Sequence, residues 1–403
     1  MPTAVIVDAV RTAGGKRNGG LAGWHPADLA AEVLKALATR NDLDPALIDD
    51  VIMGCVMQTG AQSLNVGRNA VLGAGFPESV PATTIDRQCG SSQQSAHFAA
   101  QGVIAGAYDV VIAAGVEVMS LVPMGGSIGS GMGFPFGEAA MARYANVELM
   151  EGHKGLVGQG ISAEIIANRW DLSRDDLDAF GAQSQARALT ATEEGRFDNE
   201  IIPVVSKIRD KESGEVKVLD TMVTRDEGIR PGTTAETLGN LKPAFLPDGK
   251  VTAGNSSQIT DGASAMLIMS EEKAAELGLT PRARFHTFAL AGVDPVTMLT
   301  GPIPSTAKAL AKSGLSMDDI DLFEVNEAFA SVVLSWQKEH NADMSKVNVN
   351  GGAIALGHPL GCSGTKLMAT LLNELERTGG RYGLQTMCEG GGMANATIIE
   401  RLG

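Results

Sequence analysis

The sequence predicts an α/β protein built from two duplicated halves. Helix-like segments alternate with short apolar segments typical of buried strands, which favours helices layered on a sheet. Short stretches near the two ends of the chain also repeat, with an offset of about 272 positions. The 403 residues include 49 glycines, which allow close backbone contacts between such layers.

The first half begins with a strand-like segment, VIVDAV, within Met1 to Thr12. The repeat then becomes visible: LDPALIDDV at 43–51 matches LSMDDIDLF at 315–323, and each follows a helix-like segment that contains Ala-Leu-Ala. At the same offset, CGSS at 89–92 aligns with GCSG at 361–364. Apolar strands at 110–114 and 384–387 complete the two series, and each runs into glycine. Chance similarity between short α/β segments is the alternative explanation.

The stretch between the halves has a different character. It contains a segment rich in Gly, Met and Phe at 123–137 and a dense run of charges at 207–230. Ser173 with Asp176 three residues later predicts a capped helix, with Leu177 and Phe180 on one face and Gly195 near its end. We therefore expect an inserted loop subdomain at 122–246, an N-terminal half at 1–121 completed by 247–273, and a C-terminal half at 274–403.

Composition excludes several classes of protein. The formal charge of −15 gives little support for binding to nucleic acid or to an anionic membrane surface. No apolar stretch approaches 18 residues and the N-terminus lacks the pattern of a signal peptide, so we expect a cytoplasmic protein without a membrane span. Four cysteines without a CxxC pair predict neither a disulfide framework nor a zinc site.

Cys89 is the first candidate for chemistry. It lies where a β-branched extended segment, TTIDRQ, meets a glycine turn and a helix of small residues. Backbone N–H groups at the start of a helix stabilise a thiolate, which favours a nucleophilic role. The structural alternative is a small buried thiol, as most lone cysteines are.

Three further segments carry candidate residues. His358 is framed by glycines and Pro359 in NGGAIALGHPLGCSG, although a loop histidine bonded to backbone is the alternative. Cys388 precedes consecutive glycines from Gly390, whose N–H groups can face an oxyanion. Asn326, in EVNEAFA, can orient a water or a carbonyl, whereas the neighbouring Glu327 is expected to brace the loop.

These segments together resemble the thiolase family, the acyl-CoA C-acyltransferases, over essentially the whole chain. The motifs responsible are Cys89 in its turn, NEAFA at 326–330, GHP at 357–359, CEGGG at 388–392 and TAGNSSQITDGASA at 252–265. The resemblance implies the thiolase fold, in which two duplicated α/β halves form a layered αβαβα core. It also implies cleavage of a 3-ketoacyl-CoA by coenzyme A, or the reverse Claisen condensation.

The resemblance also implies a role for each residue. Cys89 carries the acyl group, His358 activates its thiol, and Cys388 exchanges the α-proton of the acetyl-CoA portion. His358 and a water on Asn326 hold the enolate, while the N–H groups of Cys89 and Gly390 hold the tetrahedral intermediate. No metal or permanently bound cofactor is expected, since coenzyme A enters as a substrate.

Contacts with coenzyme A follow from the same resemblance: Ser257 matches a serine beside the pantetheine and Arg230 an arginine beside the adenine. Lys207, Arg209 and Lys211 are interpreted as an ordinary solvated charge run rather than a binding patch. GQG at 158–160 replaces the HMG of short-chain thiolases, and RQCGSSQQ resembles actinobacterial enzymes, some acting on steroid-derived CoA esters. We therefore expect a degradative enzyme with an altered acyl pocket.

Competing functions remain open at this point. An acetoacetyl-CoA-specific biosynthetic thiolase is one, and a non-catalytic acyl-CoA-binding scaffold is another. A decarboxylating ketoacyl synthase is disfavoured by Cys388, because those enzymes have a second histidine there, and the local cysteine signature of papain-like hydrolases is absent. The resemblance also implies a homodimer or homotetramer, with a hydratase/dehydrogenase of β-oxidation as a possible partner.

Overall fold

The structure is a computed structural model that describes residues 2–128, 131 and 133–403. Gly129, Ser130 and Met132, which belong to the predicted insertion, and Met1 lie outside the described residues. The strands of the first half are β1 (Ala4–Thr12), β2 (Gly15–Lys16), β3 (Asp50–Gly54), β4 (Ala82–Ile85), β5 (Val110–Val118) and β11 (Thr260–Ser270). Those of the second half are β12 (Ala283–Gly292), β13 (Leu322–Val325), β14 (Tyr382–Glu389) and β15 (Met393–Arg401).

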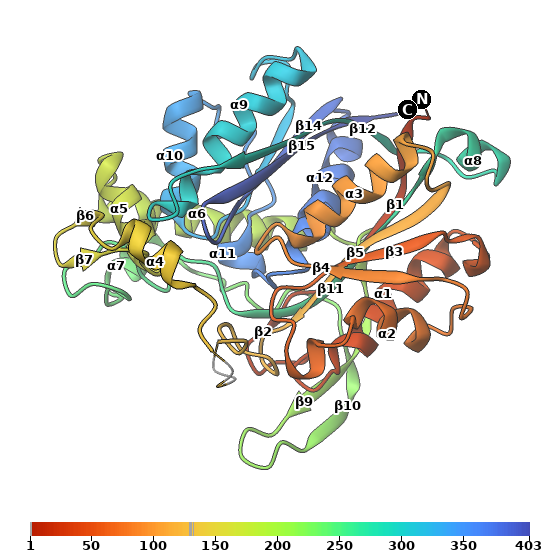
Figure 1. The fold of residues 1–403 in the computed structure, drawn as a ribbon, viewed down its shortest axis with the longest axis horizontal. Coiled ribbons are helices and arrows are strands. Elements are labelled where there is room, and N and C mark those ends of the chain that lie inside the picture. Colours follow the sequence, from red (N-terminus) through yellow and green to blue (C-terminus); the bar gives the residue numbers. More distant parts are fainter. Residues whose placement is uncertain (1, 129–130, 132) are drawn as a thin grey trace.

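The strands form one large mixed sheet in the order β13-β14-β15-β12-β1-β11-β5-β3-β4, with β2 paired to β11. Its two halves meet where β1 runs antiparallel to β12, and only Val5 with Arg284 and Ile6 with Ala283 are in register there. Each half is otherwise a separately paired set of strands, so the sheet consists of two blades joined at a narrow seam (Figure 1).

Helices cover these blades in layers. In the two halves they are α1 (Pro26–Arg40), α2 (Val66–Gly73), α3 (Ser91–Ile104), α8 (Glu271–Glu276), α9 (Pro302–Ser313), α10 (Ala330–His340), α11 (Ala353–Leu356) and α12 (Ser363–Thr378). α1 and α2 pack on the first blade, and α9 packs on the second with α10 against it. α3 and α12 pack against each other and touch strands of both blades. The α/β thiolase-like layering expected from the sequence is confirmed.

The composition of α3 explains its central place. Ser, Gln, Ala and Gly dominate SSQQSAHFAAQGVI, and most of these side chains are buried. A helix enclosed on several sides needs small residues, because neighbouring elements approach it closely. α3 and α12 begin at Ser91 and Ser363, and β5 and β14 at Val110 and Tyr382, so both pairs are 272 positions apart. The repeat in the sequence is a repeat of structural elements.

The insertion contributes α4 (Glu138–Tyr144), β6 (Glu148–Met150), β7 (His153–Lys154), α5 (Gln159–Arg169), α6 (Arg174–Glu193), β8 (Ile201–Ile202), β9 (Val204–Arg209), β10 (Val216–Val223) and α7 (Ala235–Gly239). Ser173 caps α6 in a complete capping box with Asp176, as predicted, and Leu177 and Phe180 are buried. α5 and α6 pack against α10, and α6 also packs against α11, so this part of the insertion covers the second half.

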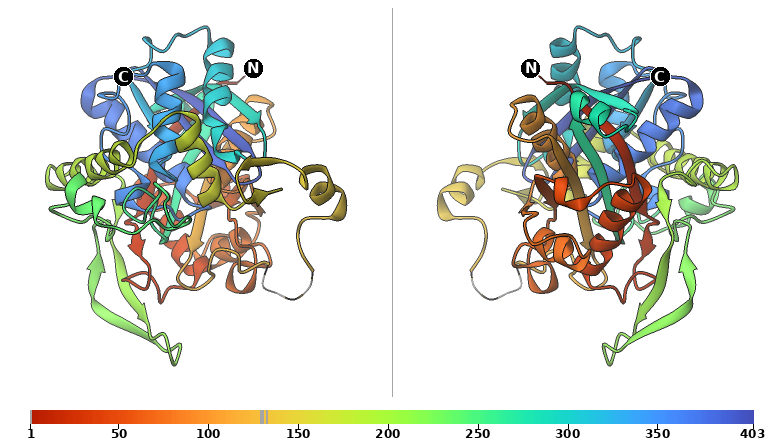
Figure 2. Two further views of the ribbon diagram at one scale, coloured as in Figure 1. Left: turned by 90° about the vertical axis from the view of Figure 1, so that its left-hand side faces the viewer. Right: turned by 90° about the vertical axis from the view of Figure 1, so that its right-hand side faces the viewer.

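The predicted charge run forms the hairpin of β9 and β10, which projects from the body (Figure 2). Lys207 is only partly solvated, because its Nζ lies 3.3 Å from the centroid of the Trp24 ring and the Trp24 indole N–H donates to the carbonyl of Val205. These contacts tie the base of the hairpin to the first half. The interpretation of Lys207, Arg209 and Lys211 as a solvated charge run rather than a binding patch stays a prediction.

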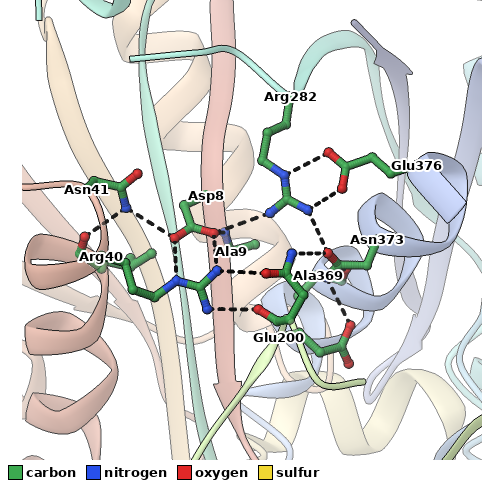
Figure 3. A network of polar contacts seen from close by, with 11 residues as sticks. Asp8, Ala9, Arg40, Asn41, Glu200, Arg282, Ala369, Asn373 and Glu376 are labelled. Atoms are coloured by element: carbon green, nitrogen blue, oxygen red, sulfur yellow. Dashed lines mark hydrogen bonds and ion pairs between the residues drawn. The ribbon is translucent and has the colours of Figure 1, made fainter. Parts of the chain in front are cut away.

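A partly buried polar network joins both halves to the insertion (Figure 3). Asp8 on β1 pairs with Arg40 at 3.0 Å and with Arg282 at 3.3 Å, and Arg282 also pairs with Glu376 of α12. Glu200 of the insertion accepts a hydrogen bond from Asn373. These contacts hold β1, α1 and α12 in one arrangement, which fixes the frame around the candidate site.

Candidate active site

Cys89 lies in a tight turn between β4, which ends at Ile85, and α3, which begins at Ser91. Gln88 adopts a left-handed φ of 48°, so the chain reverses sharply just before the cysteine. The Ser91 hydroxyl accepts from the N–H of Arg87 at 2.9 Å and donates to the carbonyl of Gln88 at 2.6 Å. The turn thus holds Cys89, which is 4% exposed, in one position at the start of α3.

Two effects of opposite sign act on the Cys89 thiol. Burial, followed by the negative charge of Glu389, raises the pKa of Cys89 to about 12. The backbone N–H groups of Cys89 and Gly390 oppose this rise in the pKa, because they stabilise negative charge on the sulfur. The thiol is therefore protonated at neutral pH, and the N–H groups of Cys89 and Gly390 are the groups that favour its thiolate.

Cys388 approaches the same point from the second half. It is the penultimate residue of β14, paired with Ala394 of β15, and its side chain is fully buried. Burial raises its pKa well above the usual range, and the next cause of this rise in the pKa is the charge of Cys89. Cys89 also shares an apolar cluster with Leu360 and Met387, neighbours of the other two candidates. The fold thus brings the two thiols together across 299 positions of sequence.

His358 is presented by the loop between α11 and α12 and is 3% exposed. Its Nδ1 lies 2.5 Å from the Ser363 hydroxyl, and that hydroxyl donates to the carbonyl of Pro359 at 2.8 Å. Since the serine proton is used by the carbonyl, Nδ1 carries the ring proton and Nε2 is the unprotonated nitrogen. Burial, with a smaller effect of Lys366, lowers the pKa of His358 to about 3. The ring is therefore neutral, with Nε2 available as a base.

Asn326 follows β13 directly, and its N–H donates to the carbonyl of Thr386 on β14 at 3.0 Å. Its Nδ2 faces Nε2 of His358 at 3.4 Å. Its Oδ1 is buried without a hydrogen-bond partner among the residues that the structure describes. A buried amide oxygen that accepts no hydrogen bond is a place where a bound water or a substrate group can donate one.

Glu327 braces the loop, as expected from the sequence. It accepts hydrogen bonds from the hydroxyl of Ser184 at 2.6 Å, the side chain of Asn348 at 3.0 Å and the N–H of Ile354 at 3.1 Å. These contacts join α6 and α11 to the end of β13. Glu327 therefore has a structural task, while its neighbour Asn326 keeps an open acceptor.

The two residues predicted to contact coenzyme A lie on segments next to this site. The N–H of Ser257 donates to the carbonyl of Ala328 at 3.0 Å, and the N–H of Arg230 donates to Gln185 at 2.7 Å. Gln258 connects these segments. Its side-chain amide donates to the carbonyl of Gly228, and its backbone carbonyl accepts from the N–H of His358. The binding roles of Ser257 and Arg230 stay predictions.

Two residues of the site escaped the sequence reasoning. Ser363 holds the His358 ring, and its only signal is its position five residues later at the start of a helix. Glu389 acts on both thiols through its charge, and the only signal was an acidic residue beside Cys388 in CEGGG. Neither signal has a meaning until the chain is folded.

All four cysteines are free and buried. Within residues 2–128, 131 and 133–403, no group of three or more His, Cys, Asp or Glu side chains is placed to hold a metal ion. Among the same residues, the helices are too short or too polar to span a bilayer. The chemistry available here consists of two thiols, a neutral imidazole, an open amide oxygen and a pair of N–H donors.

Comparison with known proteins agrees with this set of groups. The model for the thiolase N-terminal domain matches residues 4–272, and that for the thiolase C-terminal domain matches 279–401. A steroid 3-ketoacyl-CoA thiolase of Mycobacterium tuberculosis is 50% identical over 100% of this chain and 95% of its own length. A 3-ketoacyl-CoA thiolase of Aliivibrio fischeri is 46% identical over the whole of both chains.

A solved structure gives the same result. The acetyl-CoA acetyltransferase of Bacillus anthracis superposes with a TM-score of 0.87 and is 38% identical, covering 100% of this chain and 99% of that one.

Proposed function

The chain belongs to the thiolase family and is an acyltransferase, and on that premise we propose that it cleaves 3-ketoacyl-CoA through an acyl group carried on Cys89. What supports the proposal is that the charge of Cys89 acts on the buried Cys388 thiol, and that Leu360, two residues after the neutral imidazole of His358, packs in one apolar cluster with Cys89. A single thiol cannot hold an acyl group and exchange a proton with carbon at the same time.

In the first half of the reaction, Nε2 of His358 takes the proton of the Cys89 thiol. The thiolate then attacks the 3-keto carbon, and the N–H groups of Cys89 and Gly390 hold the oxyanion that forms. The bond between C2 and C3 breaks, and its electron pair passes to the enolate of acetyl-CoA. The enolate oxygen is held by His358 and by a water on Oδ1 of Asn326, and the Cys388 thiol protonates C2.

In the second half, the thiol of coenzyme A attacks the acyl-Cys89 thioester. The Cys388 thiolate takes the proton of that thiol, the bond between the acyl carbon and the Cys89 sulfur breaks, and the leaving Cys89 thiolate takes back the proton held on Nε2 of His358. The released acyl-CoA is two carbons shorter, and both cysteines return to their starting states. The steps run backwards in condensation.

The test separates the two thiols. Cys89→Ala abolishes the acyl-enzyme that intact-protein mass spectrometry detects after addition of an acyl-CoA. Cys388→Ala still becomes acylated, but acetyl-CoA no longer exchanges its α-protons with deuterated water. Normal exchange in the Cys388→Ala enzyme would contradict the assignment.

The acyl group itself is open to measurement. The steroid thiolase relative and the replacement of HMG by GQG at 158–160, at the start of α5, support a large acyl group. The acetyl-CoA acetyltransferase relative supports acetoacetyl-CoA as the second candidate. Cleavage rates over short, long and polycyclic 3-ketoacyl-CoAs decide between them, and no cleavage of any member would favour the non-catalytic scaffold.

We further propose a cytoplasmic homodimer or homotetramer in which Ser257 and Arg230 bind coenzyme A. The family supports the assembly, and β4 lies at the open edge of the sheet. Light scattering of the purified protein measures the oligomeric state. We also propose a hydratase/dehydrogenase of β-oxidation as a partner, and a pull-down with such an enzyme tests this.

A further inference from the structure

Glu389 is a buried carboxylate with no visible structural task. It is the last residue of β14 and is 0% exposed. Within the described part of the chain, neither of its carboxyl oxygens has a hydrogen-bond partner. Burying an unpaired carboxylate costs several kcal/mol, so native proteins rarely keep one without a reason.

The carboxyl group of Glu389 packs against the turn of Cys89. A methyl group built on Gly90 would lie 2.1 Å from Oε1 of Glu389, so the carboxyl occupies the space beside the residue that follows Cys89. The side-chain amide of Asn395 also lies beside Gly90, but its Nδ2 donates to the carbonyl of Gly90 at 3.0 Å. The turn is thus tied to β15 by Asn395, while the charge of Glu389 remains unneutralised by any hydrogen bond within the described residues.

The charged groups that face Glu389 come from the loop after β4. Burial has the largest effect and raises the pKa of Glu389 to about 8, with Asp86 adding to the rise in the pKa and Arg87 opposing it. Cys89 and Cys388, the titratable groups on the other sides, both have their pKa raised by the charge of Glu389. Glu389 therefore changes its charge in a pH range where the enzyme must form a thiolate.

We propose that Glu389 is a positioning residue that keeps the nucleophile reactive while its carboxyl group is protonated and suppresses the Cys89 thiolate once it ionises. The neutral carboxyl leaves the N–H groups of Cys89 and Gly390 unopposed in stabilising negative charge. The ionised carboxylate repels the thiolate and the oxyanion that follows it. This inference rests on the proposed function only in taking Cys89 as the nucleophile.

The test measures the thiol directly. Alkylation of Cys89 by iodoacetamide is followed from pH 6 to 10 by peptide mass spectrometry, which separates Cys89 from the other three cysteines. Glu389→Gln removes the charge at constant shape and moves the pH profile of Cys89 down by about one unit, which is about tenfold in rate on the rising limb. Glu389→Asp, which keeps an ionisable group, stays close to the wild type. Superimposable profiles for the wild type and Glu389→Gln would overturn the proposal.

The wild type alone gives a second measurement, which does not depend on how a variant folds. Because Glu389 and Cys89 titrate as a coupled pair, the logarithm of the alkylation rate rises with a slope below one while Glu389 ionises. A slope of one throughout the rising limb would overturn the coupling. Acylation of Cys89 by an acyl-CoA is measured in parallel, so a failure of the proposed function appears as a missing acyl-enzyme while the alkylation profile still reports on Glu389.

Discussion

Glu117 and Glu389 occupy equivalent places in the two halves, near the end of β5 and at the end of β14. They are 272 positions apart, the spacing that also separates the first residues of α3 and α12, and both are fully buried. Glu117 accepts hydrogen bonds from the N–H groups of Val56, Met57 and Gly361 and from the side chain of Gln62. Glu389 accepts none from the described residues.

This difference teaches that a place in the repeat does not fix a role, whereas the donors around it do. Burial raises the pKa of both carboxyls, but four hydrogen bonds oppose the rise in the pKa of Glu117. Glu117 therefore joins the loop after β3 to the loop before α12, which is a structural task. Glu389 lies beside the turn of Cys89 without such partners and remains free to change its charge.

The largest expected effect tests the structural member of the pair. Glu117→Ala leaves the N–H groups of Val56, Met57 and Gly361 without their acceptor and should lower the free energy of unfolding by about 3–5 kcal/mol. Glu389→Gln should not lower it at pH 7, because the variant removes an unpaired buried carboxyl group. Urea denaturation measures the free energy of unfolding of both variants. Equal losses would contradict the view that only Glu117 has a structural task.

Asn326 sharpens the comparison, because it too has an open acceptor. Asn326→Ala should lower kcat about 10²- to 10³-fold through loss of the enolate's water, with little loss of stability. Asn348 is the matched control: its side chain bonds both the N–H and the carbonyl of Val325, so Asn348→Ala should mainly destabilise the fold. Steady-state kinetics with thermal melting separates the two outcomes, and a stable, fully active Asn326→Ala enzyme would remove the proposed role.

Ser363 gives a smaller effect, because it acts through His358. Without the serine hydroxyl, Nδ1 loses its acceptor and the ring populates both tautomers, so Ser363→Ala should slow acylation of Cys89 about tenfold. Ser363→Thr keeps the hydroxyl and should restore most of the rate. Rapid-quench mass spectrometry measures acylation directly, and an unchanged rate in Ser363→Ala would show that packing alone holds the ring.

The last prediction concerns the free energy of unfolding as a function of pH, which changes only gradually from one pH unit to the next. The pKa of Glu389 is about 8 in the folded chain and near 4.5 when unfolded, so between these values the folded state binds more protons and loses stability as pH rises. Glu389→Gln should therefore gain stability relative to the wild type from pH 5 to 8, by at most about 1.4 kcal/mol for each pH unit. Near pH 4 that gain should vanish. A constant difference across the range would mean that Glu389 does not titrate there.

Much of the fold was predictable because its signals are local. The alternation of helices and strands, the capping box of Ser173 and the turn around Cys89 depend on neighbouring residues, and all three are confirmed. The contact of Lys207 with Trp24 could not be predicted in this way, because the two residues lie far apart in the sequence. The boundaries of the two halves and of the insertion stay predictions.

The sequence by itself determined the fold class, the family and the four side chains at the centre of the proposal, because these are carried by residue types in short motifs. Only the tertiary structure decided how each polar group is used. It paired Ser363 with His358, left Oδ1 of Asn326 open and gave Glu117 four donors while giving Glu389 none. The physical reason is that desolvation and most of these hydrogen-bond partners come from segments distant in the sequence, and these contacts exist only once the layers have packed.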